Sequence, residues 1–191
     1  MTDLVIASNN KGKIKEIKEM IHHIHLLSLN DICFNEEIPE PYPTFAENAY
    51  IKAKTVFNFC GKNVFADDSG ICVNALNGEP GVISAHYSGE RDDEKNLQKI
   101  LNNLTDKTDK TAYYFAVICL IWNTETYYFD GTCNGIIIPN KRGTNGFGYD
   151  PIFIPDGYNQ TFAELPLAVK NTISHRGKAI KKMIDFLIDK I

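Results

Sequence analysis

The chain has 191 residues and a formal net charge of −4, and 43% of its residues are hydrophobic and 23% charged. These ordinary globular values argue against disorder, and the sequence contains neither an apolar run of membrane-spanning length nor a signal peptide within residues 1–10. The net negative charge disfavours a general nucleic-acid binder, but it leaves a nucleotide substrate open because a triphosphate needs only a few local cations.

The first predicted elements are a buried strand at residues 4–7, a cationic turn and a helix. The apolar face of this helix consists of Ile14, Ile17, Met20 and Ile21, with Asn9 or Asn10 as the cap. The turn at 8–13 reads SNNKGK and is not a Walker A loop, because Ile14 follows Lys13 where that motif needs a hydroxyl. A cationic turn at a helix N-terminus is either a phosphate-binding site or a solvated, lysine-rich first turn.

A second helix is predicted from Thr44, which has capping-box spacing to Glu47, to about residue 59. Its expected inner positions are Ala49, Tyr50, Ala53 and Phe57. A strand at 64–66 should then end at residues 67–70, which read DDSG.

Acidic residues flank this second helix, with Glu36, Glu37 and Glu40 before it and Asp67 and Asp68 after it. Carboxylate oxygens suit Mg²⁺, which usually takes one or two carboxylates together with substrate phosphates. Side chains of neighbouring strand residues point to opposite faces, so we expect only one of the two aspartates to serve a site directly. The alternative is a plain Asx turn, for which DDSG is a good sequence.

The middle of the chain contains an irregular loop at 77–91, followed by a helix capped by Asp92 or Asp93 with an apolar face. Residues 111–121 and 125–133 are aromatic and β-branched, which predicts an antiparallel hairpin or two neighbouring strands. A short strand at 136–138 precedes a glycine-rich stretch at 142–153. Its GFGYDP segment, residues 146–151, is either a ligand loop with aromatic rings that stack on a base or a turn with core aromatics.

The C-terminal helix is predicted to start at Ser174, with His175 and Arg176 in its first turn and Lys170 just upstream. Its apolar face is Ile180, Met183, Ile184, Leu187, Ile188 and Ile191. The three histidines His22, His23 and His25 lack partners at metal-site spacing and are interpreted as surface positions. Helices that alternate with short and hairpin-like strands indicate an α/β domain around a mixed sheet.

Taken in order, five segments resemble the inosine/xanthosine triphosphate pyrophosphatase family from residue 4 to residue 179. They are SNNKGKIKE, the TFAENA helix start with its upstream glutamate, ADDSG, GFGYDPIF and ISHRGKA. The resemblance implies an elongated mixed β-sheet flanked by helices, with two lobes and a nucleotide cleft between them, as one domain over 1–191. It also implies a homodimer, Mg²⁺ dependence and hydrolysis of aberrant purine triphosphates (ITP, dITP, XTP) to a monophosphate and pyrophosphate. The five cysteines, without a CxxC pair, fit free thiols in the cytoplasm.

The resemblance also assigns roles to individual residues. Asp68 matches the catalytic acidic residue and, with Glu40, the metal-binding pair, for which Glu37 is the reserve candidate. Substrate-binding positions are Ser8, Asn9, Asn10, Lys11, Gly12 and Lys13 for the phosphates, Ser69 beside the catalytic residue, and Phe147, Gly148, Tyr149, Asp150, Lys170, His175 and Arg176 for the base and sugar.

Base choice follows from hydrogen-bond complementarity. Hypoxanthine and xanthine present a 6-oxo acceptor where adenine presents a donor, so a donor from Arg176, His175 or the backbone would reject adenine.

Two alternative functions remain open at this point. One is a related pyrophosphatase that acts on pyrimidine triphosphates, and the other is a nucleotide-binding protein without turnover. No nucleic-acid or membrane partner is expected.

Overall fold

The computed structural model describes residues 3–22 and 24–190, so His23 and Ile191 lie outside the described residues. The chain forms two compact units. Within the described residues, unit 1 comprises 3–68, 116–131 and 176–190, and unit 2 comprises 69–115 and 132–175. The expectation of a single domain over 1–191 stays a prediction.

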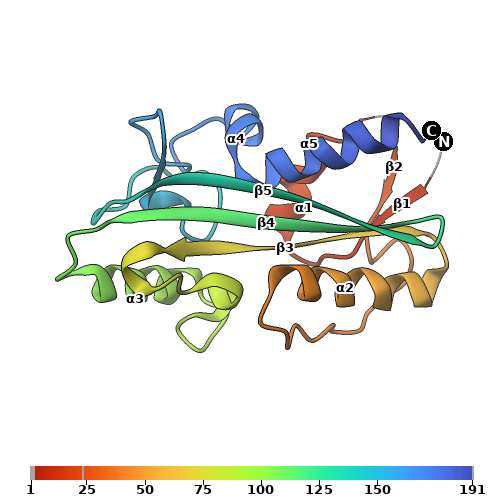
Figure 1. Ribbon diagram of the computed structural model, residues 1–191, viewed down its shortest axis with the longest axis horizontal. Coiled ribbons are helices and arrows are strands. Elements are labelled where there is room, and N and C mark those ends of the chain that lie inside the picture. Colours follow the sequence, from red (N-terminus) through yellow and green to blue (C-terminus); the bar gives the residue numbers. More distant parts are fainter. Residues whose placement is uncertain (1–2, 23, 191) are drawn as a thin grey trace. The chain divides into compact units, whose positions relative to one another are not determined.

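One six-stranded sheet has the order β2-β1-β3-β4-β5-β6 (Figure 1). Its strands are β1 (Asp3–Ile6), β2 (His25–Leu27), β3 (Asn63–Val73), β4 (Thr111–Trp122), β5 (Glu125–Ile137) and β6 (Phe153–Pro155). Strand β1 pairs in parallel with both β2 and β3, whereas β5 and β6 are antiparallel. The predicted α/β fold with a mixed sheet is therefore confirmed.

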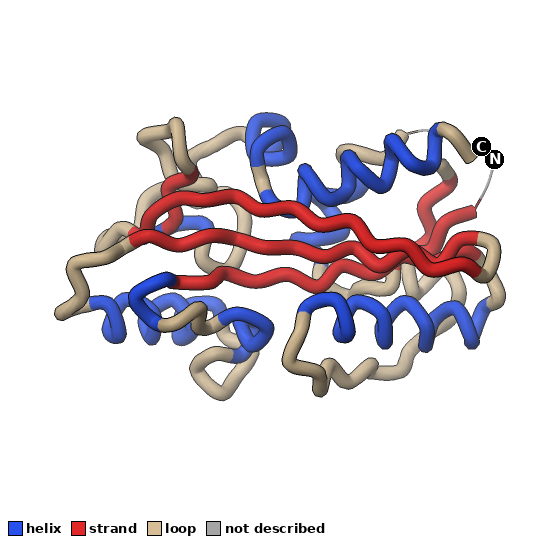
Figure 2. The backbone as a smooth tube through the Cα atoms, in the orientation of Figure 1, coloured by secondary structure: helices blue, strands red, loops and turns tan. Residues whose placement is uncertain are grey.

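In unit 1, helices cover both faces of the sheet (Figure 2). Helices α1 (Lys11–Lys18) and α5 (His175–Ile188) pack on the face that contains Leu4 and Phe65, and α2 (Phe45–Cys60) packs on the face that contains Val5 and Ala66. Both faces of β1 and β3 are apolar and covered, so these strands read as continuous apolar runs.

Unit 2 has its own core. Residues from β3, β4, β5 and β6 pack there against α3 (Asp93–Leu104) and α4 (Leu167–Ile173), with Phe153 and Phe162 fully buried. Three short 3-10 helices complete the unit: η1 (Asn74–Leu76), η2 (Gly81–His86) and η3 (Asp150–Ile152). Gly70 permits a close approach of η2 to β3, because a Cβ at this position would lie 2.3 Å from the Gly81 carbonyl oxygen.

Most predicted helix starts are confirmed. Asn10, Thr44 and Asp92 each accept a hydrogen bond from a backbone N–H in the first turn of their helix.

The turn between β4 and β5 consists of Asn123 and Thr124, both with positive φ, which matches the tight hairpin turn whose twist suits neighbouring strands.

Several sequence-based expectations are wrong in detail. Tyr50 is 37% exposed and Ile188 66% exposed, because the packed stripe of each helix lies closer to the sheet than these positions. The predicted strand at 136–138 overlaps the end of β5 at Ile137, because the strand predicted at 125–133 continues beyond Cys133, and the loop at 77–91 contains η2. β2, β6 and α4 were not predicted, since each is too short to show a clear periodicity.

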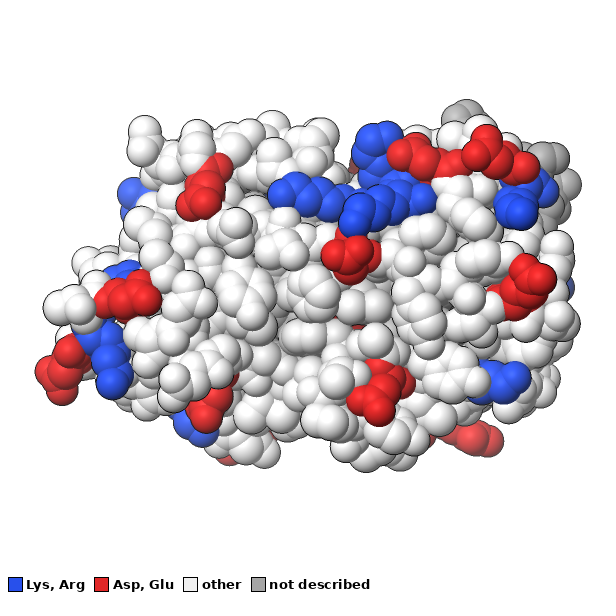
Figure 3. All heavy atoms as spheres, in the orientation of Figure 1, with Lys and Arg blue, Asp and Glu red and all other residues white. Residues whose placement is uncertain are grey.

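The surface of α5 in unit 1 carries lysines that are matched by carboxylates. Lys181 lies 3.1 Å from Asp185, and Lys182 lies 3.0 Å from Asp130 of β5. Basic and acidic atoms accordingly lie next to one another in the upper right of Figure 3.

None of the helices in the described part of the chain has the length and apolar character that a membrane span needs.

Candidate functional site

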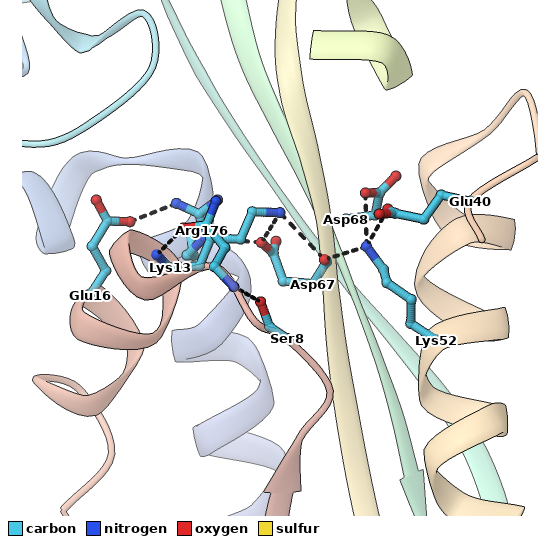
Figure 4. A network of polar contacts seen from close by, with 9 residues as sticks. Ser8, Lys13, Glu16, Glu40, Lys52, Asp67, Asp68 and Arg176 are labelled. Carbon is cyan, nitrogen blue, oxygen red and sulfur yellow. Dashed lines mark hydrogen bonds and ion pairs between the residues drawn. The ribbon is translucent and has the colours of Figure 1, made fainter. Parts of the chain in front are cut away.

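Asp67 and Asp68 lie in the middle of β3 rather than in a turn. The predicted end of the strand at this point, and the Asx-turn alternative, are wrong because β3 continues to Val73. Each carboxylate has a cation partner, so it can be buried, and tertiary contacts override the turn preference of DDSG. Since strand side chains alternate, Asp67 shares the face of Phe65 with α1 and α5, and Asp68 shares the face of Ala66 with α2 (Figure 4). The predicted division of the two aspartates between opposite faces is confirmed.

Asp67 binds two cations on its face of the strand. The Nζ atom of Lys13 lies 2.8 Å from Oδ2 of Asp67, and Nε of Arg176 donates to the same oxygen at 3.2 Å. Burial alone would raise the pKa of Asp67, but the charges of Arg176 and Lys13 hold it well below its usual range. Asp67 is therefore an ionised carboxylate that fixes the position of the lysine.

Arg176 connects α5 to α1 and β3. Its Nη1 atom donates to Oε2 of Glu16 at 2.6 Å, and both side chains are buried. A cation in the first turn of a helix is unfavourable toward the helix dipole, and here Glu16 and Asp67 supply the compensating charge. Burial lowers the pKa of Arg176, but these two carboxylates raise it above its ordinary value. Glu16 was not identified from the sequence; its only signal is a position next to Ile17 on the inner side of α1.

The SNNKGK turn forms the start of α1 on this same face. Ser8 Oγ accepts the Asn10 N–H at 3.2 Å, and Asn10 Oδ1 accepts the Lys13 N–H at 3.0 Å. Burial lowers the pKa of Lys13 below its ordinary value, and the Asp67 carboxylate opposes this effect. Lys11, by contrast, is exposed. The turn therefore combines one anchored lysine, one exposed lysine and the N–H groups of a helix start, which is an arrangement that favours phosphate.

On the opposite face of β3, Lys52 of α2 links the acidic residues. Its Nζ atom donates to Asp68 Oδ1 at 3.0 Å, to Glu40 Oε2 at 2.6 Å and to the Asp67 carbonyl oxygen at 2.9 Å. Burial raises the pKa of Asp68 to about 6, against the lowering effect of the Lys52 charge, and the nearby Glu40 carboxyl adds to the increase. Glu36, Glu37 and Glu40 are all exposed, and of the three it is Glu40 whose carboxylate contacts Lys52.

Lys52 was missed by sequence reasoning, although the chain contains a signal for it. It lies between Ala49 and Ala53 on the buried stripe of α2, where an isolated lysine needs a carboxylate partner.

The donor chemistry of Glu40 and Asp68 fits a divalent cation. Oδ2 of Asp68 is buried and has no hydrogen-bond partner among the described residues, and the Glu40 carboxylate reaches the same lysine. Over residues 3–22 and 24–190, no group of three or more His, Cys, Asp or Glu side chains is arranged to hold a metal alone. A pair of carboxylates that substrate phosphates would complete is the pattern that Mg²⁺ favours.

In unit 2, the GFGYDP segment folds around Asp150. Asp150 Oδ2 accepts the Phe147 N–H at 2.9 Å and lies 2.5 Å from Lys170 Nζ of α4. Lys170 Nζ also lies 5.2 Å from the centroid of the Phe147 ring. Gly146 has φ +76°, and a Cβ there would lie 2.0 Å from Asp150 Oδ2, so this position requires glycine. The structure thus brings three of the predicted base-side residues together.

The other predicted base-side residues differ in their surroundings. His175 is 3% exposed, and its ring stacks on Tyr114 at 4.6 Å between centroids. Tyr149 is buried, and its hydroxyl donates to the Ser84 carbonyl oxygen at 2.7 Å, so its polar end points into the core of unit 2. Gly148 is partly buried and donates its N–H to Asp93 of α3 at 2.9 Å. Ser69 follows Asp68 in β3 and is partly buried.

Comparison with known sequences identifies close similarity over nearly the full chain. The sequence model of the Ham1 family matches residues 4–186. A relative from Flavobacterium psychrophilum, named dITP/XTP pyrophosphatase, is 51% identical over 185 residues, covering 96% of this chain and 97% of the relative. A relative of the same name from Flavobacterium johnsoniae is 50% identical over 186 residues, with 96% and 97% covered.

Solved structures are similar as well. The Ham1 protein of Staphylococcus aureus has a TM-score of 0.90 at 42% identity, with 100% of both chains covered. A nucleoside-triphosphatase / dITP/XTP pyrophosphatase of Mycobacterium abscessus has a TM-score of 0.77 at 37% identity, covering 96% of this chain and 99% of that chain.

The buried ion pairs of Arg176 lead to a prediction for stability. Arg176→Ala leaves two buried carboxylates, Glu16 and Asp67, without their shared cation, so the free energy of unfolding should fall by about 3–5 kcal/mol. Lys181→Ala, which removes an exposed lysine of the same helix whose partner Asp185 is also exposed, is the matched control and should change it by less than about 0.5 kcal/mol. Urea denaturation of the three proteins measures both values. A loss below about 1 kcal/mol for Arg176→Ala would show that the network contributes little to folding.

Proposed function

The chain belongs to the Ham1 family, and on this basis we propose that it hydrolyses aberrant purine nucleoside triphosphates (ITP, dITP and XTP) to the nucleoside monophosphate and pyrophosphate. The names of its relatives, dITP/XTP pyrophosphatase, support the substrate class. The observation that supports the chemistry most directly is the placement of Asp67 and Asp68 on opposite faces of β3, one with the cationic turn and the other with Lys52 and Glu40.

The cationic turn is suited to the triphosphate, which carries about four negative charges. Lys13, held by Asp67, and the exposed Lys11 would bind phosphate oxygens and stabilise the charge that develops on departing pyrophosphate. The N–H groups at the start of α1 add partial positive charge to the same place. Binding at this turn would leave the base free to be recognised by other residues.

Asp68 is suited to act on the attacking water. Its carboxylate would accept a proton from water as the new phosphorus–oxygen bond forms and the bond to pyrophosphate breaks. A carboxylate whose pKa lies near 6 is a stronger base than an ordinary aspartate and is still ionised at neutral pH. Lys52 fixes the orientation of this carboxylate through Oδ1, and the other oxygen, Oδ2, is buried without a hydrogen-bond partner among the described residues.

Glu40 and Asp68 are the residues that we propose to hold Mg²⁺. When bound, the ion would polarise phosphoryl oxygens and neutralise part of their charge. Glu40 is favoured over the reserve candidate Glu37 because it contacts the lysine that also binds Asp68. Glu40 and Asp68 thus bring two carboxylates to one lysine. Membership of the family is the second support for metal dependence.

Base recognition is proposed for the residues around Asp150. Phe147 and Lys170 lie against this carboxylate, and the stacked His175 provides a ring with donor capacity. Arg176 is proposed as a further donor toward the 6-oxo group, although its Nε and Nη1 atoms contact Asp67 and Glu16. The resemblance further leads us to propose a cytoplasmic homodimer, and five cysteines that form no disulfide among the described residues are in keeping with a reducing compartment.

One prediction of the proposed function concerns the reaction itself. Incubation with ITP should yield IMP and pyrophosphate in equal amounts, and Asp68→Asn should lower kcat at least about 10²-fold because the base and a metal ligand are lost together. Asp67→Asn should lower kcat less, since this side chain contacts Lys13 on the other face. Anion-exchange chromatography of the products identifies them and measures the turnover of the wild-type protein and of both variants. Production of IDP and orthophosphate would refute the reaction class, and equal losses in both variants would refute the division between the two faces.

Another prediction separates phosphate binding from base recognition. Lys13→Ala should lower kcat/KM for ITP and ATP to a similar extent, because every triphosphate shares the phosphates. Arg176→Lys keeps a positive charge beside Glu16 and Asp67 but loses the planar guanidinium, so the ITP/ATP ratio of kcat/KM should fall by roughly 10- to 150-fold.

An unchanged ITP/ATP ratio in Arg176→Lys, with both substrates impaired alike, would contradict a role in base recognition. Arg176 would then serve the phosphates and the fold, and base choice would have to come from His175 and the backbone of residues 147–150.

A further inference from the structure

We propose that Tyr114 is a positioning residue for base recognition, one that holds the His175 ring and the Asp150 carboxylate in place at the same time. The inference rests on the proposed function and deepens it, because it adds a residue that belongs to none of the five family-like segments. All of the contacts that carry it lie within unit 2.

The ring of Tyr114 fixes the plane of the His175 ring. The two rings are stacked with 4.6 Å between centroids and an interplanar angle of 10°. Tyr114 is itself held from other sides, with Phe153 edge-on at 4.9 Å and 78° and Phe162 at 5.7 Å. Since Tyr114 is 7% exposed and Phe153 and Phe162 are fully buried, the tyrosine ring has little room to rotate. The imidazole plane is therefore set by a rigid aromatic cluster.

The hydroxyl of Tyr114 makes the second contact. It lies 3.4 Å from Oδ1 of Asp150, whereas Oδ2 of the same carboxylate accepts the Phe147 N–H and lies against Lys170. The loop and the lysine thus engage one oxygen, and Tyr114 contacts the other. Together they restrict rotation of the carboxylate about its terminal torsion, which is otherwise broad for aspartate.

These two contacts distinguish Tyr114 from an ordinary core aromatic residue. Phenylalanine would fill the same space among Phe153, Phe162 and His175, and it would avoid the cost of burying a hydroxyl. Tyr114 instead directs its polar atom at a carboxylate that already contacts Phe147 and Lys170. The ring and the hydroxyl can therefore be tested separately by substitution.

The experiment compares Tyr114→Phe and Tyr114→Leu with Tyr87→Phe. Tyr87 is the matched control, because it is a buried tyrosine of the same core whose hydroxyl also contacts a carboxylate, that of Glu79 at 2.9 Å. Tyr114→Phe should raise KM for ITP about 2- to 10-fold with kcat within about 2-fold of wild type, as expected for one hydrogen bond that serves binding. Tyr114→Leu should raise KM further and reduce the ITP/ATP ratio of kcat/KM.

Two further measurements separate positioning from a structural role. Inorganic tripolyphosphate, used as a competitive inhibitor, should keep its inhibition constant in both Tyr114 variants, because phosphate binding involves unit 1 residues. Tyr87→Phe should leave KM for ITP unchanged even if its melting temperature falls.

The inference is overturned if Tyr114→Phe retains the wild-type KM and ITP/ATP ratio, or if KM for ITP and the tripolyphosphate constant rise together. Because Tyr114→Phe keeps the ring, it tests the proposal even if Tyr114→Leu does not fold. Absence of ITP hydrolysis by the wild-type protein would refute the proposed function and the inference with it, whereas normal wild-type hydrolysis with unaltered Tyr114 variants would refute the inference alone.

Discussion

The alternation of side chains along β3 determines how the unit 1 site is organised. Two adjacent carboxylates, Asp67 and Asp68, must point to opposite faces of the strand. One face presents the cationic turn of α1, and the other presents Lys52 and Glu40. The two groups of side chains meet at the backbone carbonyl oxygen of Asp67, which accepts from Lys52 Nζ at 2.9 Å and from Lys13 Nζ at 3.5 Å. Moving either aspartate by one residue would exchange its partners and bring like charges together.

Because these charged side chains are buried, each of them needs a defined partner. The carboxylate of Asp67 and the guanidinium of Arg176 are almost fully buried, and a buried charge is tolerated only when it is paired and hydrogen-bonded. The same principle holds in unit 2, where Lys170 lies 2.5 Å from Asp150 and both side chains are buried. Each pair fixes two side chains relative to the backbone before any nucleotide binds. Less rearrangement is then needed when charge develops in the transition state.

The sequence was informative where local chemistry decides the structure. The caps Asn10, Thr44 and Asp92 were predictable because each satisfies N–H groups of its own helix. The continuation of β3 through DDSG was not, because a turn is locally preferred there and only distant cations stabilise the strand. Lys52 and Glu16 were missed for the same reason, since their partners lie far away in the chain. The five ordered motifs nevertheless identified the family. Most of the predicted site residues lie either around Asp67 and Asp68 in unit 1 or around Asp150 in unit 2.

We propose one activity for this chain, the magnesium-dependent hydrolysis of aberrant purine triphosphates to a monophosphate and pyrophosphate. It is tested most directly by a turnover survey in which pyrophosphate release is measured from ITP, XTP, GTP, ATP, UTP and dTTP, with Mg²⁺ and with the metal removed by a chelator. We expect ITP and XTP to be hydrolysed with a much higher kcat/KM than the other four, and all turnover to be lost without the metal. Equal turnover of all six nucleotides, a preference for UTP or dTTP, or undiminished activity without a divalent cation would contradict the account.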